Sequence, residues 1–273
     1  MRVCLMIEGQ EGVTWDQWRA LAETAEANGF EALFRSDHYE SLGAGPNTGS
    51  LDAWGTINAL AALTTTLKLG TLVSPVTFRH PSVLARSVVT ADHVSNGRVE
   101  LGIGAGWHEG EHRSFGFSFD TTGDRFARLA EQIEIVSRSW DDEPFDFEGR
   151  FYRLEQCDAQ PKPAHRPNLI LGGSARPRGA ALAARWADEY NTVDPTADEA
   201  RERKERIDAA CREAGRDPIA FSAMIPLEGA PDALIARLRG LAEAGVERVM
   251  LQHLAHEDLA TVELVGREVI GAV

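Results

Sequence analysis

An acid and an imidazole stand side by side directly after an apolar run of this sequence. Asp37 and His38 follow residues 32–34, which are typical of a buried strand. Histidine suits proton transfer, because its ordinary pKa of about 6.5 makes both protonation states accessible near neutral pH. The pair therefore predicts either a hydrogen-bonded turn at a strand end or a catalytic site. The elements around it must decide between the two.

Two glycine-rich stretches could bring backbone close to a ligand. In "GIGAGW", residues 102–107, the third glycine does not lead into a helix and no ribose-binding acid follows at the expected distance, which disfavours a dinucleotide fingerprint. Its glycines either admit a flat or phosphorylated ligand or relieve crowding in a barrel wall. In "LGGSAR", residues 171–176, we expect Ser174 to cap a helix whose free N–H groups bind phosphate. An ordinary turn is the alternative.

The stretch "HEGEH", residues 108–112, matches the HExxH pattern of zinc proteases. That mechanism needs both imidazoles on one face of a helix, whereas Gly110 lies in the middle of this stretch and no third ligand is evident. We expect a polar loop beside the site, with a short helical turn at most, and no metal.

Strand and helix patterns alternate along the whole chain, which predicts an α/β fold. Eight such units in 273 residues are typical of a (β/α)8 barrel, and we expect one barrel domain over residues 1–273. An aromatic segment with a proline-rich connection, residues 141–167, predicts an insertion between the fourth and fifth strands. The expected strands are 2–8, 32–35, 67–74, 98–106, 168–173, 188–193, 219–225 and 246–253.

In a (β/α)8 barrel the functional groups gather at the carboxyl ends of the strands. The polar or glycine-rich positions predicted at that face are Glu8, Asp37, His38, Ser74, 105–108, 172–174, Asn191 and Thr192. A shared face favours the catalytic interpretation of the acid and imidazole.

The composition disfavours several classes of binding partner. A formal net charge of −14 disfavours nucleic acid and anionic membrane surfaces. Three scattered cysteines predict reduced thiols, and no apolar run reaches the roughly 20 residues of a membrane helix. We expect a soluble, cytoplasmic protein that acts on a small molecule.

Four motifs occur in the order "FRSDHY", "LGTLVSPVTFRHP", "SNGRVELGIGAGWHEGEH" and "LILGGSA". Together they resemble the luciferase-like family of flavin and deazaflavin barrels, and most closely its coenzyme F420-dependent oxidoreductases. The resemblance covers nearly the whole chain. It implies a barrel with an insertion region, and a homodimer.

The resemblance also implies site residues. Asp37 and His38 would lie over the reactive centre of the deazaflavin, with His38 transferring the proton and Asp37 orienting the imidazole or holding it charged. A non-proline cis peptide is implied between Leu72 and Val73, behind the tricyclic ring. The implied cofactor-binding residues are Asp37, His38, Leu72, Val73, Ser74, Gly104, Ala105, Gly106, Trp107, Gly172, Gly173, Ser174, Asn191 and Thr192.

The implied reaction is hydride transfer between F420 and a small organic substrate. Trp107 stands where the sugar-phosphate dehydrogenases of the family carry a carboxylate, which argues against a sugar-phosphate substrate. One alternative is an FMN-dependent monooxygenase that receives reduced FMN from a separate flavin reductase. A second is a flavin-binding protein without catalytic activity.

Overall fold

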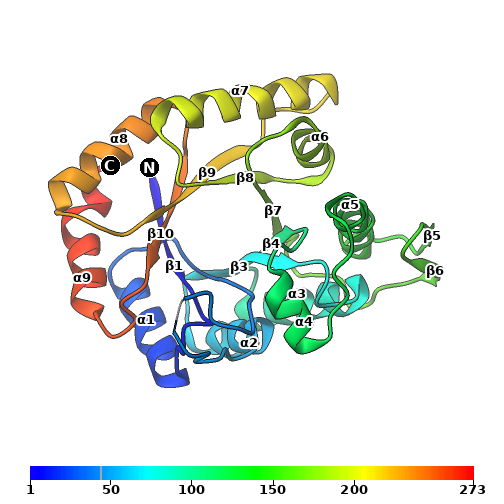
Figure 1. The fold of residues 1–273 in the computed structure, drawn as a ribbon, viewed down its shortest axis with the longest axis horizontal. Coiled ribbons are helices and arrows are strands. Elements are labelled where there is room, and N and C mark those ends of the chain that lie inside the picture. The colour runs from blue at the N-terminus through cyan, green and yellow to red at the C-terminus, as the bar shows by residue number, and fades with distance from the viewer. Residues whose placement is uncertain (44) are drawn as a thin grey trace.

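A computed structural model describes residues 1–43 and 45–273 and places a closed parallel barrel at the centre of this part of the chain (Figure 1). Its strands are almost wholly buried because helices cover their outer faces. The barrel order is β1-β10-β9-β8-β7-β4-β3-β2, closed by parallel pairing of β1 with β2. The strands are β1 (Arg2–Ile7), β2 (Ala32–Arg35), β3 (Lys68–Pro75), β4 (Val99–Gly104), β7 (Asn168–Gly172), β8 (Glu189–Val193), β9 (Ala220–Pro226) and β10 (Arg248–His253). The predicted (β/α)8 barrel is thereby confirmed.

Helices follow the strands and pack around the barrel. Several of their starts follow local sequence signals: Thr14 and Gln17 form a capping box at α1, and Pro81 opens α3. The helices are α1 (Trp15–Ala27), α2 (Ala53–Leu63), α3 (Pro81–Ser95), α4 (Glu109–Phe115), α5 (Thr122–Ser139), α6 (Pro177–Trp186), α7 (Ala197–Glu213), α8 (Pro231–Glu243) and α9 (Leu259–Glu268), with a 3-10 turn at Ile270–Ala272. No helix among the described residues is long and apolar enough to cross a membrane.

The predicted insertion is present between β4 and β7. It contains a hairpin of two antiparallel strands, β5 (Phe145–Glu148) and β6 (Arg153–Cys157), which projects from the barrel beside α5 (Figure 1).

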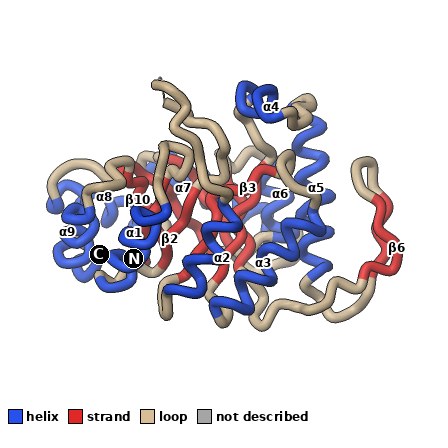
Figure 2. Tube along the Cα trace, turned by 90° about the horizontal axis from the view of Figure 1, so that it is seen from below, coloured by secondary structure: helices blue, strands red, loops and turns tan. Residues whose placement is uncertain are grey.

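The stretch 108–112, expected to be a polar loop with a short helical turn at most, instead forms the start of helix α4. The His108 side chain caps its first turn, and Gly116 ends it in the left-handed conformation, with φ of 73°. Gly110 lies in the first turn, where a glycine interrupts the helix least. Figure 2 shows α4 raised above one end of the strands.

The opposite end of the barrel interior is filled by a buried ion-pair network. Arg248 Nη1 lies 2.6 Å from Glu100 Oε2 and 3.0 Å from Glu189 Oε2, and all three side chains are almost completely buried. These residues stand at the amino ends of their strands, so the network closes the end of the barrel away from the predicted site.

Candidate active site

A cavity of about 550 Å³ opens among the carboxyl ends of the barrel strands and the loops that follow them. Its size lies within the range of cofactor and substrate pockets. Ten predicted site residues line it: His38, Leu72, Val73, Gly104, Ala105, Gly106, Trp107, Gly172, Gly173 and Asn191. The structure therefore brings together the carboxyl ends of β2, β3, β4, β7 and β8, although His38 and Asn191 are 153 positions apart in the sequence.

One wall of the cavity is shaped by β3 and by the glycines at and just after the end of β4. The Leu72–Val73 peptide bond is cis, as the resemblance implied. A Cβ atom at Gly104 would lie 2.7 Å from Val73 Cγ2, so side-chain atoms there would crowd this wall. Gly106 has φ of 77°, which other residues rarely adopt. This wall is therefore built from backbone and small groups, which suits a flat ligand.

His38 reaches the cavity from the segment after β2, and its hydrogen-bond partner is Glu111 of α4. The Nδ1 atom of His38 lies 2.8 Å from Glu111 Oε2. The other carboxylate oxygen of Glu111 accepts backbone N–H groups from Tyr39 and Glu40. Glu111 is fully buried, whereas the His38 side chain keeps 16% of its surface exposed. Three donors from one loop thus fix a carboxylate behind the imidazole.

The charge of Glu111 determines which nitrogen of His38 carries a proton. Burial alone would raise the pKa of Glu111, but the hydrogen bond and charge of His38, together with the two backbone donors, outweigh it and lower the pKa below its ordinary value. An ionised carboxylate only accepts hydrogen bonds, so His38 Nδ1 carries a proton and Nε2 is left for a ligand.

The other two histidines on this wall are held by groups of the protein. His112 lies 2.7 Å by Nδ1 from the His108 carbonyl oxygen and 2.6 Å by Nε2 from Thr77 Oγ1, so both of its ring nitrogens are used. His108 Nδ1 accepts the Glu111 N–H at 3.3 Å. Within residues 1–43 and 45–273, no group of three or more His, Cys, Asp or Glu residues is arranged to hold a metal ion.

Asp37 does not orient His38, contrary to the prediction. Its Oδ2 atom accepts from Arg79 Nη1 at 2.5 Å and from Ser74 Oγ at 2.7 Å, and the residue is almost fully buried. These bonds hold the Asp37 carboxylate at Ser74 and Arg79, and Asp37 is not among the described residues that line the cavity. Arg79, paired with both Asp37 and Asp52, has its pKa raised: these charges outweigh the effect of its burial.

Three further residues expected to bind cofactor are not among the described residues that line the cavity. Ser74 Oγ accepts from Trp54 Nε1 and donates to Asp37. Thr192 is fully buried, and its hydroxyl accepts from Arg203 at 2.5 Å. Ser174 is exposed and is not a helix cap, because α6 begins at Pro177 with Arg176 as its cap residue.

The predicted phosphate-binding turn has fewer free backbone N–H groups than expected. The Gly173 N–H donates to the Asn191 carbonyl at 3.0 Å, and the Ala175 N–H donates to the Tyr190 hydroxyl at 2.9 Å. Two of the donors that would bind a phosphate are therefore used within the protein. Gly172 and Gly173 still line the cavity.

Glu111 and Arg79 were given no role in the sequence analysis. Both lie inside motifs quoted there, Glu111 in "HEGEH" and Arg79 in "TFRHP", but no spacing links position 111 to position 38. The only local signal was a charged residue close after a strand end. Glu8 was placed at the correct face, and its carboxylate oxygens accept from Gln10 and Gln252 at the cavity edge.

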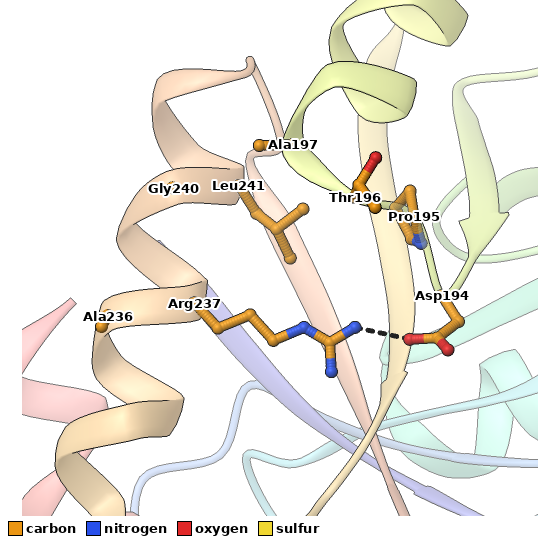
Figure 3. A pocket seen from close by; sticks show the side chains of 8 residues that line it. All are labelled: Asp194, Pro195, Thr196, Ala197, Ala236, Arg237, Gly240 and Leu241. Atoms are coloured by element: carbon orange, nitrogen blue, oxygen red, sulfur yellow. Dashed lines mark hydrogen bonds and ion pairs between the residues drawn. The ribbon is translucent and has the colours of Figure 1, made fainter.

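A second depression, of about 360 Å³, lies outside the barrel between the start of α7 and α8 (Figure 3). Its charged groups pair with each other: Arg237 Nη2 lies 2.5 Å from Asp194 Oδ1. The first turn of α7 is satisfied by a capping box between Thr196 and Glu199. Because its polar groups are already paired, we place no chemistry there.

Comparisons with known proteins agree with this architecture. The family described as luciferase-like monooxygenase matches residues 3–258. A solved F420-dependent secondary alcohol dehydrogenase, in complex with an F420-acetone adduct, superposes with a TM-score of 0.88 at 18% identity, covering 100% of this chain and 98% of that one. At this identity the match concerns the fold.

Sequence relatives use different cofactors. An uncharacterized protein of Mycobacterium tuberculosis is 31% identical over 250 residues, 85% of each chain. An FMNH(2)-dependent dimethylsulfone monooxygenase of Pseudomonas fluorescens is 34% identical over 178 residues, 65% of this chain and 48% of that protein. An F420-dependent glucose-6-phosphate dehydrogenase of Nakamurella multipartita is 34% identical over 176 residues, 63% of this chain and 50% of that protein. With the family match spanning nearly all of its barrel, the chain belongs to the luciferase-like monooxygenase family.

Proposed function

We propose that this protein is a coenzyme F420-dependent oxidoreductase that transfers hydride between the deazaflavin and a small organic substrate, with His38 as proton donor or acceptor. The observation that carries the proposal is the hydrogen bond between His38 and buried Glu111 at the wall of the cavity. A histidine with one nitrogen held by a carboxylate and the other free is suited to proton transfer.

The residues of the cavity fit a tricyclic cofactor. Gly104 and Gly106 keep side-chain atoms off one wall, and Val73 lies beside Gly104 on the same wall. We expect Val73 and residues 104–106 to contact the ring system, and Gly172 and Gly173 to lie toward its phosphate. When bound, the deazaflavin would supply or accept the hydride.

His38 would perform the proton half of the reaction through Nε2. Glu111 fixes the imidazole and stabilises its positive charge when both nitrogens are protonated. Leu42, Phe78 and Trp107 contribute apolar surface to the same cavity and would reduce the water around the transferred proton.

An FMN-dependent monooxygenase is the second candidate, favoured by the 34% identity to the FMNH(2)-dependent dimethylsulfone monooxygenase. It would require reduced FMN from a separate reductase. A flavin-binding protein without activity is the third. The homodimer implied by the resemblance stays a prediction.

Side-by-side titrations with F420, FMN and a nicotinamide nucleotide test the cofactor. We expect F420 to bind at least about tenfold more tightly than FMN, a difference of roughly 1.4 kcal/mol. Preferential FMN binding, with oxygen consumption in the presence of a reductase, would instead support the monooxygenase.

A substitution of His38 tests the chemistry. In His38→Asn the side-chain amide can still donate to Glu111, so the buried carboxylate keeps a partner. We expect F420 affinity within several-fold of the wild type and a kcat lower by about 10²–10⁴-fold on an enone, imine and alcohol panel. An unchanged kcat would remove His38 from the mechanism, and no turnover by the wild type would favour a binding protein.

A further inference from the structure

We infer that His108 is a second substrate-binding imidazole, whose Nε2–H group joins His38 in binding the oxygen atom of an uncharged ketone or secondary alcohol. The inference rests on the proposed oxidoreductase function and names the substrate class of the same site. It follows from the protonation state of His108, its distance from His38 and the charges around the cavity.

The position of the proton on His108 is fixed by α4. Its Nδ1 atom accepts the backbone N–H of Glu111 at 3.3 Å and so caps the helix. A ring nitrogen that accepts a hydrogen bond carries no proton, so the neutral imidazole carries its proton on Nε2. His108 lines the cavity, and within residues 1–43 and 45–273 no protein acceptor bonds its Nε2. His108 is therefore available as a hydrogen-bond donor.

The two imidazoles are close enough to share one ligand atom. The ring centroids of His38 and His108 are 6.5 Å apart, with an interplanar angle of 82°. An oxygen atom in hydrogen-bond contact with a ring nitrogen lies about 4 Å from that ring's centroid. The centroid separation is therefore short enough for one oxygen to lie between the two rings. The Trp107 ring lies 5.8 Å from His38 and 5.2 Å from His108, and adds apolar surface beside this point.

The charges around the cavity favour an uncharged substrate. Among the described residues that line it, Glu8 and Glu111 are acidic and none is Lys or Arg. A carboxylate group of a substrate bound beside His38 would lie close to the buried charge of Glu111, with no Lys or Arg among the described lining residues to balance it, which is unfavourable at low dielectric. A carbonyl or hydroxyl oxygen needs only the hydrogen bonds that two imidazoles offer.

The roles of the two histidines differ during the reaction. In ketone reduction, hydride from the reduced cofactor bonds to the carbonyl carbon, and the π electron pair moves to the oxygen. That oxygen takes the Nε2 proton of protonated His38, which becomes neutral. His108 keeps its proton and stabilises the charge that develops on the oxygen. In alcohol oxidation the same transfers run in reverse.

Two substitutions separate substrate binding by His108 from helix capping. In His108→Asn the amide oxygen takes the place of Nδ1 and still caps α4, but no donor replaces Nε2–H. In His108→Gln an amide N–H takes the place of Nε2, while the cap is lost. With reduced F420 and a panel of short ketones, we expect kcat/KM to fall by about 30-fold or more in His108→Asn, with Tm and F420 affinity unchanged. His108→Gln should stay within about fivefold of wild-type kcat/KM but have a lower Tm.

Matched ketones test the substrate charge, and NMR tests the tautomer without turnover. Butan-2-one should be reduced with a kcat/KM at least about tenfold above that of pyruvate. In histidine-¹⁵N-labelled protein at pH 8, the signals that disappear in His108→Asn should show a protonated Nε2 and an unprotonated Nδ1.

Several outcomes would overturn the inference. They are wild-type kcat/KM in His108→Asn, a proton on His108 Nδ1, a preference for pyruvate, or F420 binding without reduction of any ketone. Failure to bind F420 would instead contradict the proposed function itself. The NMR measurement would then still show which nitrogen of His108 carries the proton.

Discussion

Glu111 Oε2 lies 2.8 Å from Nδ1 of His38, although the two residues are 73 positions apart in the sequence. The carboxylate is fully buried and ionised, and backbone donors from the loop that carries His38 hold its other oxygen. The contact therefore joins the segment after β2 to α4, and it sets both the orientation and the tautomer of the imidazole.

Glu111→Gln should reduce activity through that tautomer. The Gln oxygen can still accept from Tyr39 N–H and Glu40 N–H, but its amide would donate to His38 Nδ1 and move the proton to Nε2. We expect kcat to fall by about 100-fold with F420 affinity nearly unchanged. Proton positions measured by ¹⁵N NMR check the cause. Lost activity with the proton still on Nδ1 would contradict this explanation.

Asp37→Asn also replaces a carboxylate by an amide, at the residue next to His38. It should reduce stability and leave kcat nearly unchanged. Asp37 neutralises buried Arg79, which keeps only Asp52 as a charged partner in the variant. We expect the free energy of unfolding to fall by about 1–3 kcal/mol and kcat to change by less than about fivefold. Urea denaturation and steady-state kinetics measure the two quantities. A kcat loss as large as that of Glu111→Gln would give Asp37 a catalytic role.

Gly106→Ala should weaken cofactor binding as well as stability. Gly106 has φ of 77°, and an added Cβ would lie 2.9 Å from Thr77 Oγ1, which contacts His112 at the cavity wall. Gly116→Ala is the matched control, because Gly116 has φ of 73° and no atom lies within 4 Å of its added Cβ. Both should lose about 1 kcal/mol of stability from backbone strain. Only Gly106→Ala should lose at least about tenfold in F420 affinity, measured by fluorescence titration. Equal affinities would exclude this segment from the cofactor site.

Stability should fall on acidification because of Glu26, which lies away from the cavity. Its Oε1 atom accepts backbone N–H groups from Thr65 at 2.8 Å and Leu67 at 2.9 Å, and Thr66 N–H donates to the same oxygen. Burial opposes the charge, but these donors together lower the pKa of Glu26 to about 2. A pKa below its unfolded value adds stability above about pH 4.5, and this is lost as the pH falls toward 2.

After allowance for solvent screening, we expect Glu26→Gln to cost about 1–2 kcal/mol at pH 7 and less near pH 2. The exposed Glu23→Gln on the same helix should stay within about 0.5 kcal/mol of the wild type. Denaturant unfolding at a series of pH values measures both. An equal loss for Glu26→Gln at every pH would contradict the charge-based explanation.

The sequence by itself determined the elements of this protein and the face on which its site lies. Hydrophobic periodicity is a short-range property, so it predicted the strands and, from their alternation with helices, the closed barrel. It predicted neither α4 nor the start of α6 at Pro177. The order of polar strand ends then placed His38 at the carboxyl face, because parallel strands bring those ends together.

Only the tertiary structure decided which side chains touch. Asp37 and His38 are neighbours in sequence, yet Asp37 pairs with Arg79 whereas His38 lines the cavity. Glu111 meets His38 because α4 folds over the barrel, a contact that no periodicity or spacing expresses. Local pattern predicts helices and strands, whereas contacts between them depend on packing across the whole barrel. The acid that contacts the His38 imidazole is therefore Glu111, and not its sequence neighbour Asp37.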